Sequence, residues 1–235
     1  MGPELGFGWT LGDDGDENIV LIKIAWGGRS LAVDFRPPSS GGTTGLYYES
    51  MLATTFKTLS RLSQLFPDYN NRQDNDDTDY GNAKIGHEIA GFAWHQGWND
   101  GCDFNMTAEY ESNLANLIRD VRTDLGVPDL PVSIGVSGMN GWKDPPSHDN
   151  IDEPPDRRTA IIAAQFAVAN ATLYPEFKGT VASVETRSFH RPPKPASPGD
   201  QVYHWNNNCE SYWLIGKAMG QAMINLIRRN NKLKL

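Results

Sequence analysis

Cysteine is scarce in this chain of 235 residues, which contains only Cys102 and Cys209. Two cysteines exclude a disulfide framework and a four-cysteine zinc site, and they leave open whether the thiols are free or joined in one bridge. No run of 18 apolar residues occurs, so the sequence predicts no transmembrane helix. The first residues lack the basic and apolar start of a signal peptide, and the compartment stays undetermined.

Basic residues are outnumbered, because 21 Lys and Arg face 29 Asp and Glu and leave a formal net charge of −8. An acidic chain without a basic stripe is not expected to bind nucleic acid or an anionic membrane surface. Apolar residues make up 39% of the chain. That fraction is enough for a buried core and too high for a disordered chain.

Metal-binding patterns are also missing, so we expect neither a metal site nor a cofactor. None of the five histidines pairs with another histidine or cysteine at zinc spacing. An acidic cluster lies at Asp74, Asp76, Asp77 and Asp79. No register of this cluster supplies both the glycine and the final glutamate of a calcium-binding loop, so we interpret it as a solvated loop.

Apolar segments of strand and helix type alternate along the chain. After an opening helix with Leu5, Trp9 and Leu11 on one side, strands are predicted at 18–26, 89–94, 132–136 and 180–184. Helices are predicted at 48–62, 107–125, 159–171 and 208–229. This alternation indicates an α/β fold of three layers, a mainly parallel sheet with helices on both faces.

In such a sheet a ligand binds beyond the carboxyl ends of the strands. Gly27 and Gly28 follow the first predicted strand and let backbone N–H groups approach a ligand oxygen, although a plain tight turn explains them as well. The side-chain amides of Gln96 and Asn99 follow the second strand. They can donate to an oxyanion, or else cap their own loop.

Further candidates for catalysis lie at the same edge. His204 precedes the last helix, and Asp200 lies close enough in sequence to orient its ring, although ordinary surface polarity explains the pair too. Ser30 and Ser137 follow predicted strands and are weak candidates for a nucleophile, since small turn residues are common there. Several tryptophans at these strand ends suit either a sugar ring or simple packing, namely Trp26, Trp94, Trp98, Trp142 and Trp205.

Three blocks spread over the chain resemble the SGNH hydrolases, and more closely their sialate O-acetylesterase-like, carbohydrate acetylesterase branch. The blocks are VLIKIAWGGRSL (20–31), IAGFAWHQGWND (89–100) and YHWNNNCESYWLIGKAMGQA (203–222). The resemblance implies one flavodoxin-like domain over residues 1–235. It also implies that a serine nucleophile hydrolyses acetyl esters on carbohydrates. In that reading Gly27 or Gly28 and Asn99, with Gln96 as a second donor, hold the oxyanion, and His204 is the base beside Asp200.

The chain departs from this family pattern in two ways. Asp200 lies four residues before His204 instead of three, and no glycine-serine turn of the family's nucleophile type occurs. We therefore expect an N-terminally incomplete domain whose partner is an acetylated carbohydrate. An inactive, carbohydrate-binding remnant and a structural or regulatory domain remain the alternatives, and a homo-oligomer stays open.

The missing nucleophile strand would lie between the predicted strands 18–26 and 89–94. Without it both strands lose a neighbour and expose unpaired backbone groups. The sequence then predicts one of three outcomes. The two strands pair directly, another segment or a partner chain fills the gap, or the isolated chain is poorly soluble.

Overall fold

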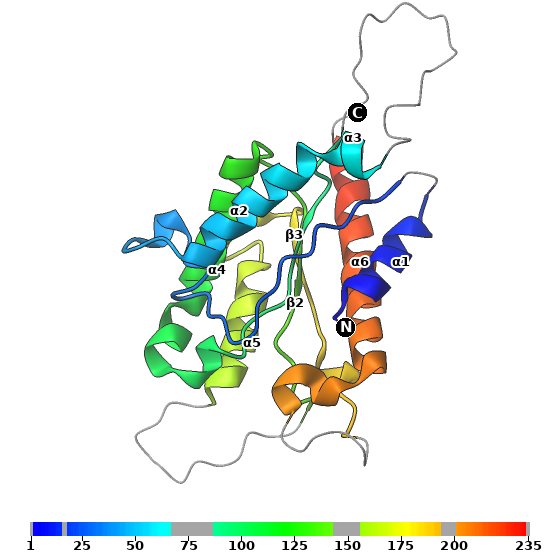
Figure 1. The fold of residues 1–235 in the computed structure, drawn as a ribbon. Helices are drawn as coiled ribbons and strands as arrows, with labels where there is room; N and C mark the ends of the chain where they lie inside the picture. The colour runs from blue at the N-terminus through cyan, green and yellow to red at the C-terminus, as the bar shows by residue number, and fades with distance from the viewer. Residues whose placement is uncertain (1, 16–17, 67–86, 143–155, 194–200, 234–235) are drawn as a thin grey trace, which may run out of the picture.

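The computed structural model describes residues 2–15, 18–66, 87–142, 156–193 and 201–233. A parallel sheet of three strands, in the order β1-β2-β3, lies in the middle of the described part (Figure 1). The strands are β1 (Phe92–Trp94), β2 (Val132–Gly135) and β3 (Val181–Val184). Phe92 pairs with Val132, which in turn pairs with Val181.

Helices cover both faces of the sheet, as the alternating pattern predicts, so the three-layer α/β fold is confirmed (Figure 1). On one side lie α2 (Leu46–Leu59), α4 (Phe104–Leu125) and α5 (Arg157–Val168), and α3 (Leu62–Leu65) follows α2. On the other lie α1 (Glu4–Gly12) and α6 (Cys209–Leu233). Short 3₁₀ helices occupy connecting loops: Pro38–Ser40, Asp100–Cys102, Pro175–Phe177, Arg187–Phe189 and Val202–Asn207.

Helix α4 shows how local sequence sets an element's ends. The Asp103 side chain accepts a hydrogen bond from the Met106 amide and caps the start, and Gly126 ends the helix in a left-handed conformation. Between these caps the apolar stripe from Tyr110 to Val121 is buried. The larger core cluster joins this stripe to strand residues such as Ile134.

The opening helix packs through a face that its apolar residues do not predict. Leu5 and Trp9 are exposed, which corrects the expected apolar side. Helix α1 instead lies along α6 (Figure 1). A Cβ added at Gly6 would lie 2.3 Å from the Trp213 carbonyl oxygen, and one at Gly216 2.0 Å from that of Pro3. Glycine on each helix therefore permits this close backbone contact.

The predicted strand 18–26 is wrong. In the described part of the chain these residues form no backbone hydrogen bonds, and β1 pairs only with β2. The physical reason is that a strand exists only with a hydrogen-bonded neighbour, and this apolar segment has none. Direct pairing with 89–94, the first of the three expected outcomes, is therefore also wrong.

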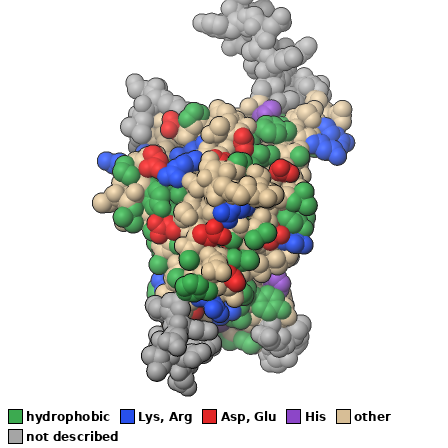
Figure 2. Space-filling model, turned by 90° about the vertical axis from the view of Figure 1, so that its left-hand side faces the viewer, with side chains coloured by type: hydrophobic (Ala, Val, Ile, Leu, Met, Phe, Trp, Pro, Cys, Tyr) green, Lys and Arg blue, Asp and Glu red, His purple; other side chains and the backbone are tan. Residues whose placement is uncertain are grey.

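The surface carries charges of both signs, and both cysteines lie on it (Figure 2). Figure 2 shows acidic and basic side chains interspersed on one face of the molecule. No helix in the described ranges is long and apolar enough to cross a membrane. Cys102 and Cys209 are both free and exposed, which resolves the alternative of a bridge.

Candidate active site at the carboxyl edge of the sheet

The loop after β1 is tied to the turn that follows Gly27 and Gly28. The Gln96 side-chain amide donates to the Arg29 carbonyl at 2.9 Å and to the Asp100 carboxylate at 2.6 Å. Both glycines are exposed, and Gly28 has a φ of 65°. Because the amide hydrogens of Gln96 have these partners, Gln96 holds two loops together in this arrangement.

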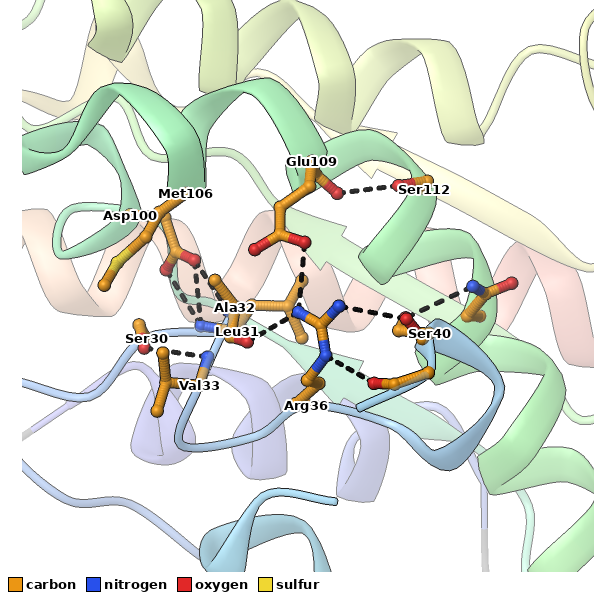
Figure 3. Close-up of polar contacts among 12 residues, drawn as sticks. Ser30, Leu31, Ala32, Val33, Arg36, Ser40, Asp100, Met106, Glu109 and Ser112 are labelled. Atoms are coloured by element: carbon orange, nitrogen blue, oxygen red, sulfur yellow. Dashed lines mark hydrogen bonds and ion pairs between the residues drawn. The ribbon is translucent and has the colours of Figure 1, made fainter. Parts of the chain in front are cut away.

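Asp100 is the main anchor of that turn, and the sequence analysis did not single it out. Its buried carboxylate accepts hydrogen bonds from the Leu31 amide at 2.9 and 3.0 Å and from the Ala32 amide at 2.9 Å (Figure 3). Burial raises the pKa of Asp100, against the hydrogen bonds from Gln96, Leu31 and Ala32 that lower it. The position of Asp100 at the end of the motif Trp-Asn-Asp was the available signal.

The Ser30 hydroxyl serves its own turn. It donates to the Asp34 carboxylate at 3.0 Å and accepts from the Val33 amide at 3.2 Å. Ser30 is 1% exposed. These are the hydrogen bonds of a residue that caps a turn. Activation of a serine requires a base such as histidine at its hydroxyl, and no described histidine contacts the hydroxyl of Ser30.

Ser137 lies at the end of β2 beside the loop after β1. Its backbone amide donates to the Gln165 side chain at 2.8 Å, and its hydroxyl contacts the Met139 sulfur at 3.2 Å. A Cβ at Gly97 would lie 2.9 Å from the Ser137 Cβ and 2.7 Å from a methyl of Ile161. With its φ of 152°, Gly97 lets the loop pass this close to Ser137 and α5.

Gln165 is a second buried polar residue that the sequence analysis missed. It donates to the Gln96 carbonyl at 2.7 Å and to the Tyr110 hydroxyl at 3.0 Å. Tyr110 in turn donates to the Gln96 carbonyl at 3.0 Å. The available signal was a lone glutamine in the apolar run of α5, because a buried polar side chain needs a hydrogen-bond partner. Here that partner is the loop after β1.

His204 lies exposed in the 3₁₀ segment Val202–Asn207, and its ring is 4.6 Å from the Tyr203 ring. Asp200, its predicted partner, lies outside the described residues. The Tyr203 ring is also 6.0 Å from Trp98, the neighbour of Asn99. Asn99 is half-buried, and its backbone carbonyl accepts from the Cys102 amide. Contacts of their neighbours thus bring the loops of His204, Asn99 and Arg29 together.

The turn after His204 is strained. Trp205, Asn206 and Asn207 have φ values of 52°, 52° and 54°, a left-handed conformation that costs side-chain-bearing residues about 1–2 kcal/mol each. Trp205 is buried, and its indole N–H donates to Nε2 of His95 at 3.3 Å. Strain that the surroundings hold in place is common beside functional residues, and this turn directly follows His204.

His95 holds this turn as a neutral ring. Its Nε2 accepts from Trp205, so its Nδ1 carries the proton and donates to the Gly135 carbonyl at 2.9 Å. Burial lowers the pKa of His95, and the bond to Gly135 only partly offsets this shift. The ring thus links β2 to the His204 turn.

No group of three or more metal-ligating side chains occurs in the described ranges, and the acidic cluster Asp74–Asp79 lies outside them. The arrangement offers exposed glycine amides, the Asn99 amide and a solvent-facing imidazole around one edge of the sheet. Such groups suit acyl transfer, in which donors hold an oxyanion and a histidine moves protons.

Comparisons with known proteins agree with this chemistry. The family model of the carbohydrate esterase, sialic acid-specific acetylesterase family matches residues 1–173. The chain therefore belongs to that family. A probable carbohydrate esterase of Arabidopsis thaliana is 28% identical over 114 residues, which cover 48% of this chain and 42% of the relative.

The crystal structure of the same Arabidopsis protein matches with a TM-score of 0.50 at 19% identity. The match covers 84% of this chain and 57% of that one, and it supports the fold alone. The chain spans about half the length of these relatives.

Proposed function

We propose that this chain carries part of the active site of an esterase that removes acetyl groups from carbohydrates. The contacts that join the loops of Gly28, Asn99 and His204 carry this proposal. His204 acts first as general base and then as general acid. Asn99 and a backbone amide at Gly27 or Gly28 hold the oxyanion, and Asp200 is the partner of His204.

The nucleophilic serine is proposed to lie on a strand outside these 235 residues, which would form one incomplete domain. Two observations support this. The hydroxyl of Ser30 caps its own turn, and that of Ser137 has a weak sulfur contact in place of a base. Within the described residues, the outer side of β1 and the segment 18–26 also leave backbone groups unpaired, as they would beside a missing strand.

A test compares hydrolysis of p-nitrophenyl acetate and acetylated sugars by the chain alone and by the chain extended with a serine-bearing upstream strand. We expect activity only in the extended form, abolished by His204→Ala. Asn99→Ala should lower kcat by about a hundred-fold, the scale for losing one oxyanion donor. Hydrolysis by the chain alone would point to Ser30 or Ser137.

A carbohydrate-binding remnant without activity is the second candidate, favoured by the occupied hydroxyls of Ser30 and Ser137. Binding of a sugar by the chain, with no hydrolysis even in the extended form, would establish this candidate instead. A domain with no sugar ligand would bind none of the sugars.

A further inference from the structure

Arg158 lies over a tryptophan at the carboxyl edge of the sheet. Its guanidinium carbon is 3.9 Å from the centroid of the Trp98 ring. A Cβ at Gly101 would lie 3.3 Å from the Arg158 Cγ, so the side-chain stem packs closely on this loop. The buried Nε has no hydrogen-bond partner. Packing of the stem on the loop and of the guanidinium on the ring together restrict the motion of this side chain.

The charge of Arg158 is uncompensated within the described residues. Asp156, two positions earlier, instead caps α5 through the amides of Arg158 and Thr159. A second stack shows the contrast, since Arg187 lies 3.9 Å above Trp142 but forms two hydrogen bonds to Glu185, at 2.9 and 2.6 Å. Two equivalent stacks therefore differ in that only Arg187 has a carboxylate partner.

Arg158 borders the proposed reaction centre through Trp98. The Trp98 ring neighbours Asn99 in the chain and lies 6.0 Å from Tyr203, which contacts His204. The planar guanidinium of an arginine presents the N–H groups along its edge as a fork, which matches the two oxygens of a carboxylate. A substrate bound beside Asn99 and His204 would meet this fork.

We propose that Arg158, oriented by Trp98, is a specificity-determining residue that binds the carboxylate of an acidic sugar. The inference rests on the proposed function, because it places the sugar at that site. A carboxylate is favoured over a sulfate or phosphate because one planar fork faces it, whereas a tetrahedral anion usually gathers several cationic groups. The family description, which names sialic acid, is consistent with a carboxylate-bearing sugar.

The test measures binding by the chain as it exists, without acetyl groups or hydrolysis. The probes are the methyl glycoside of N-acetylneuraminic acid, its neutral methyl ester and N-acetylglucosamine 6-sulfate, titrated by calorimetry or ligand-observed NMR. We expect the free acid to bind at least about ten-fold more tightly than the ester, as for a charge-assisted bidentate pair. Added salt should reduce that difference.

Arg158→Gln should lower affinity for the acid to that for the ester and leave the ester unaffected. Arg158→Lys should bind the acid more tightly than Arg158→Gln but less tightly than the unchanged chain, since lysine keeps the charge and loses the fork. Arg157→Gln removes the same charge one residue away and should change neither affinity by more than about two-fold. Melting temperatures would confirm that all variants fold.

Equal binding of acid and ester, no binding of either, tighter binding of the sulfated sugar, or an equal loss in Arg157→Gln would overturn the proposal. These outcomes are separate from the esterase assays. Hydrolysis can fail while the acid binds through Arg158, and hydrolysis of neutral acetylated sugars can succeed while Arg158 proves irrelevant.

Discussion

Two neighbouring parts of the N-terminal region are held in opposite ways. The loop from Arg29 to Gly45 is fastened by Asp100 to the 3₁₀ helix before α4, and by an ion pair of Arg36 with Glu109 at 3.0 Å to α4 itself (Figure 3). Hydrogen bonds of Ser39 to Asp120 also join this loop to α4. The segment 18–26 has no backbone hydrogen bond in the described structure. Side-chain carboxylates, of which Asp100 is buried, and not a sheet, therefore hold the part of this region that borders the site.

The largest expected effect comes from breaking the stronger anchor. Asp100→Ala leaves the amides of Leu31 and Ala32 without an acceptor, each a cost of about 1–3 kcal/mol. It also removes one of the two acceptors of the Gln96 side-chain amide, which keeps its hydrogen bond to Arg29. We expect a loss of about 3 kcal/mol or more in the free energy of unfolding, measured by urea denaturation. Asp103→Ala removes only a helix cap and should cost about 1 kcal/mol. Equal losses in the two variants would mean that Asp100 is no special anchor.

A smaller effect is expected from the cap inside the same loop. Ser30→Ala removes the acceptor of the Val33 amide but leaves the hydrogen bond that the Ser30 amide donates to the Asp34 carboxylate. The free energy of unfolding should fall by about 1 kcal/mol, as for other caps. In an active, extended protein, the kcat of Ser30→Ala should stay within about two-fold of the kcat measured with Ser30 in place. A folded variant without any activity would identify Ser30 as the nucleophile and contradict the structural role.

A pH-dependent effect should mark the turn after His204, which is anchored by the neutral ring of His95. Because burial lowers the pKa of His95, the unfolded chain takes up a proton near pH 6.5 while the folded chain does not. The contribution of the neutral His95 ring to the free energy of unfolding is therefore present in full above about pH 6.5, and it declines as the pH falls below that value. Melting temperatures of the chain should fall more steeply from pH 7 to 5 than those of His95→Gln, whose side-chain oxygen can still accept from Trp205. Parallel curves would show that His95 does not titrate in this way.

The smallest effect on stability is expected at the exposed start of segment 18–26, which forms no backbone hydrogen bond in the described structure. Ile19 and Val20 are 44% and 45% exposed, so changing both to threonine should alter the free energy of unfolding by less than about 0.5 kcal/mol. The same change should reduce self-association, measured by light scattering, because exposed apolar segments beside unpaired backbone promote aggregation. Ile24→Thr is the control, since Ile24 packs on the core and should cost more. A large loss for the exposed pair would place the whole segment in the core.

The sequence predicts most of the fold because most elements carry their own signals. The apolar stripe of α4 and its caps at Asp103 and Gly126 are local, and the structure confirms the helix. The short apolar strands at β1, β2 and β3 are likewise found within the predicted ranges. The segment 18–26 carries an equally strong apolar signal. It fails because pairing depends on a neighbour, which no local pattern reveals.

For the candidate site the sequence locates the loops but not the contacts within them. Gln96 is predicted to donate to an oxyanion, and the structure gives its amide hydrogens to Arg29 and Asp100. The catalytic roles of Asn99 and His204 remain predictions. The roles of Asp100, His95 and Arg158 depend on partners 40 to 110 residues away in the chain, which sequence reasoning could not pair with them.

Composition and periodicity by themselves determined the α/β class, the helices and three of the strands, because these follow from the spacing of apolar residues and from caps next to them in sequence. Only the tertiary structure decided that segment 18–26 forms no backbone hydrogen bond with the described residues, that Ser30 caps a turn and that the charge of Arg158 has no described partner. Those outcomes depend on which distant groups meet, since hydrogen bonds and ion pairs act over a few ångströms whatever the separation along the chain.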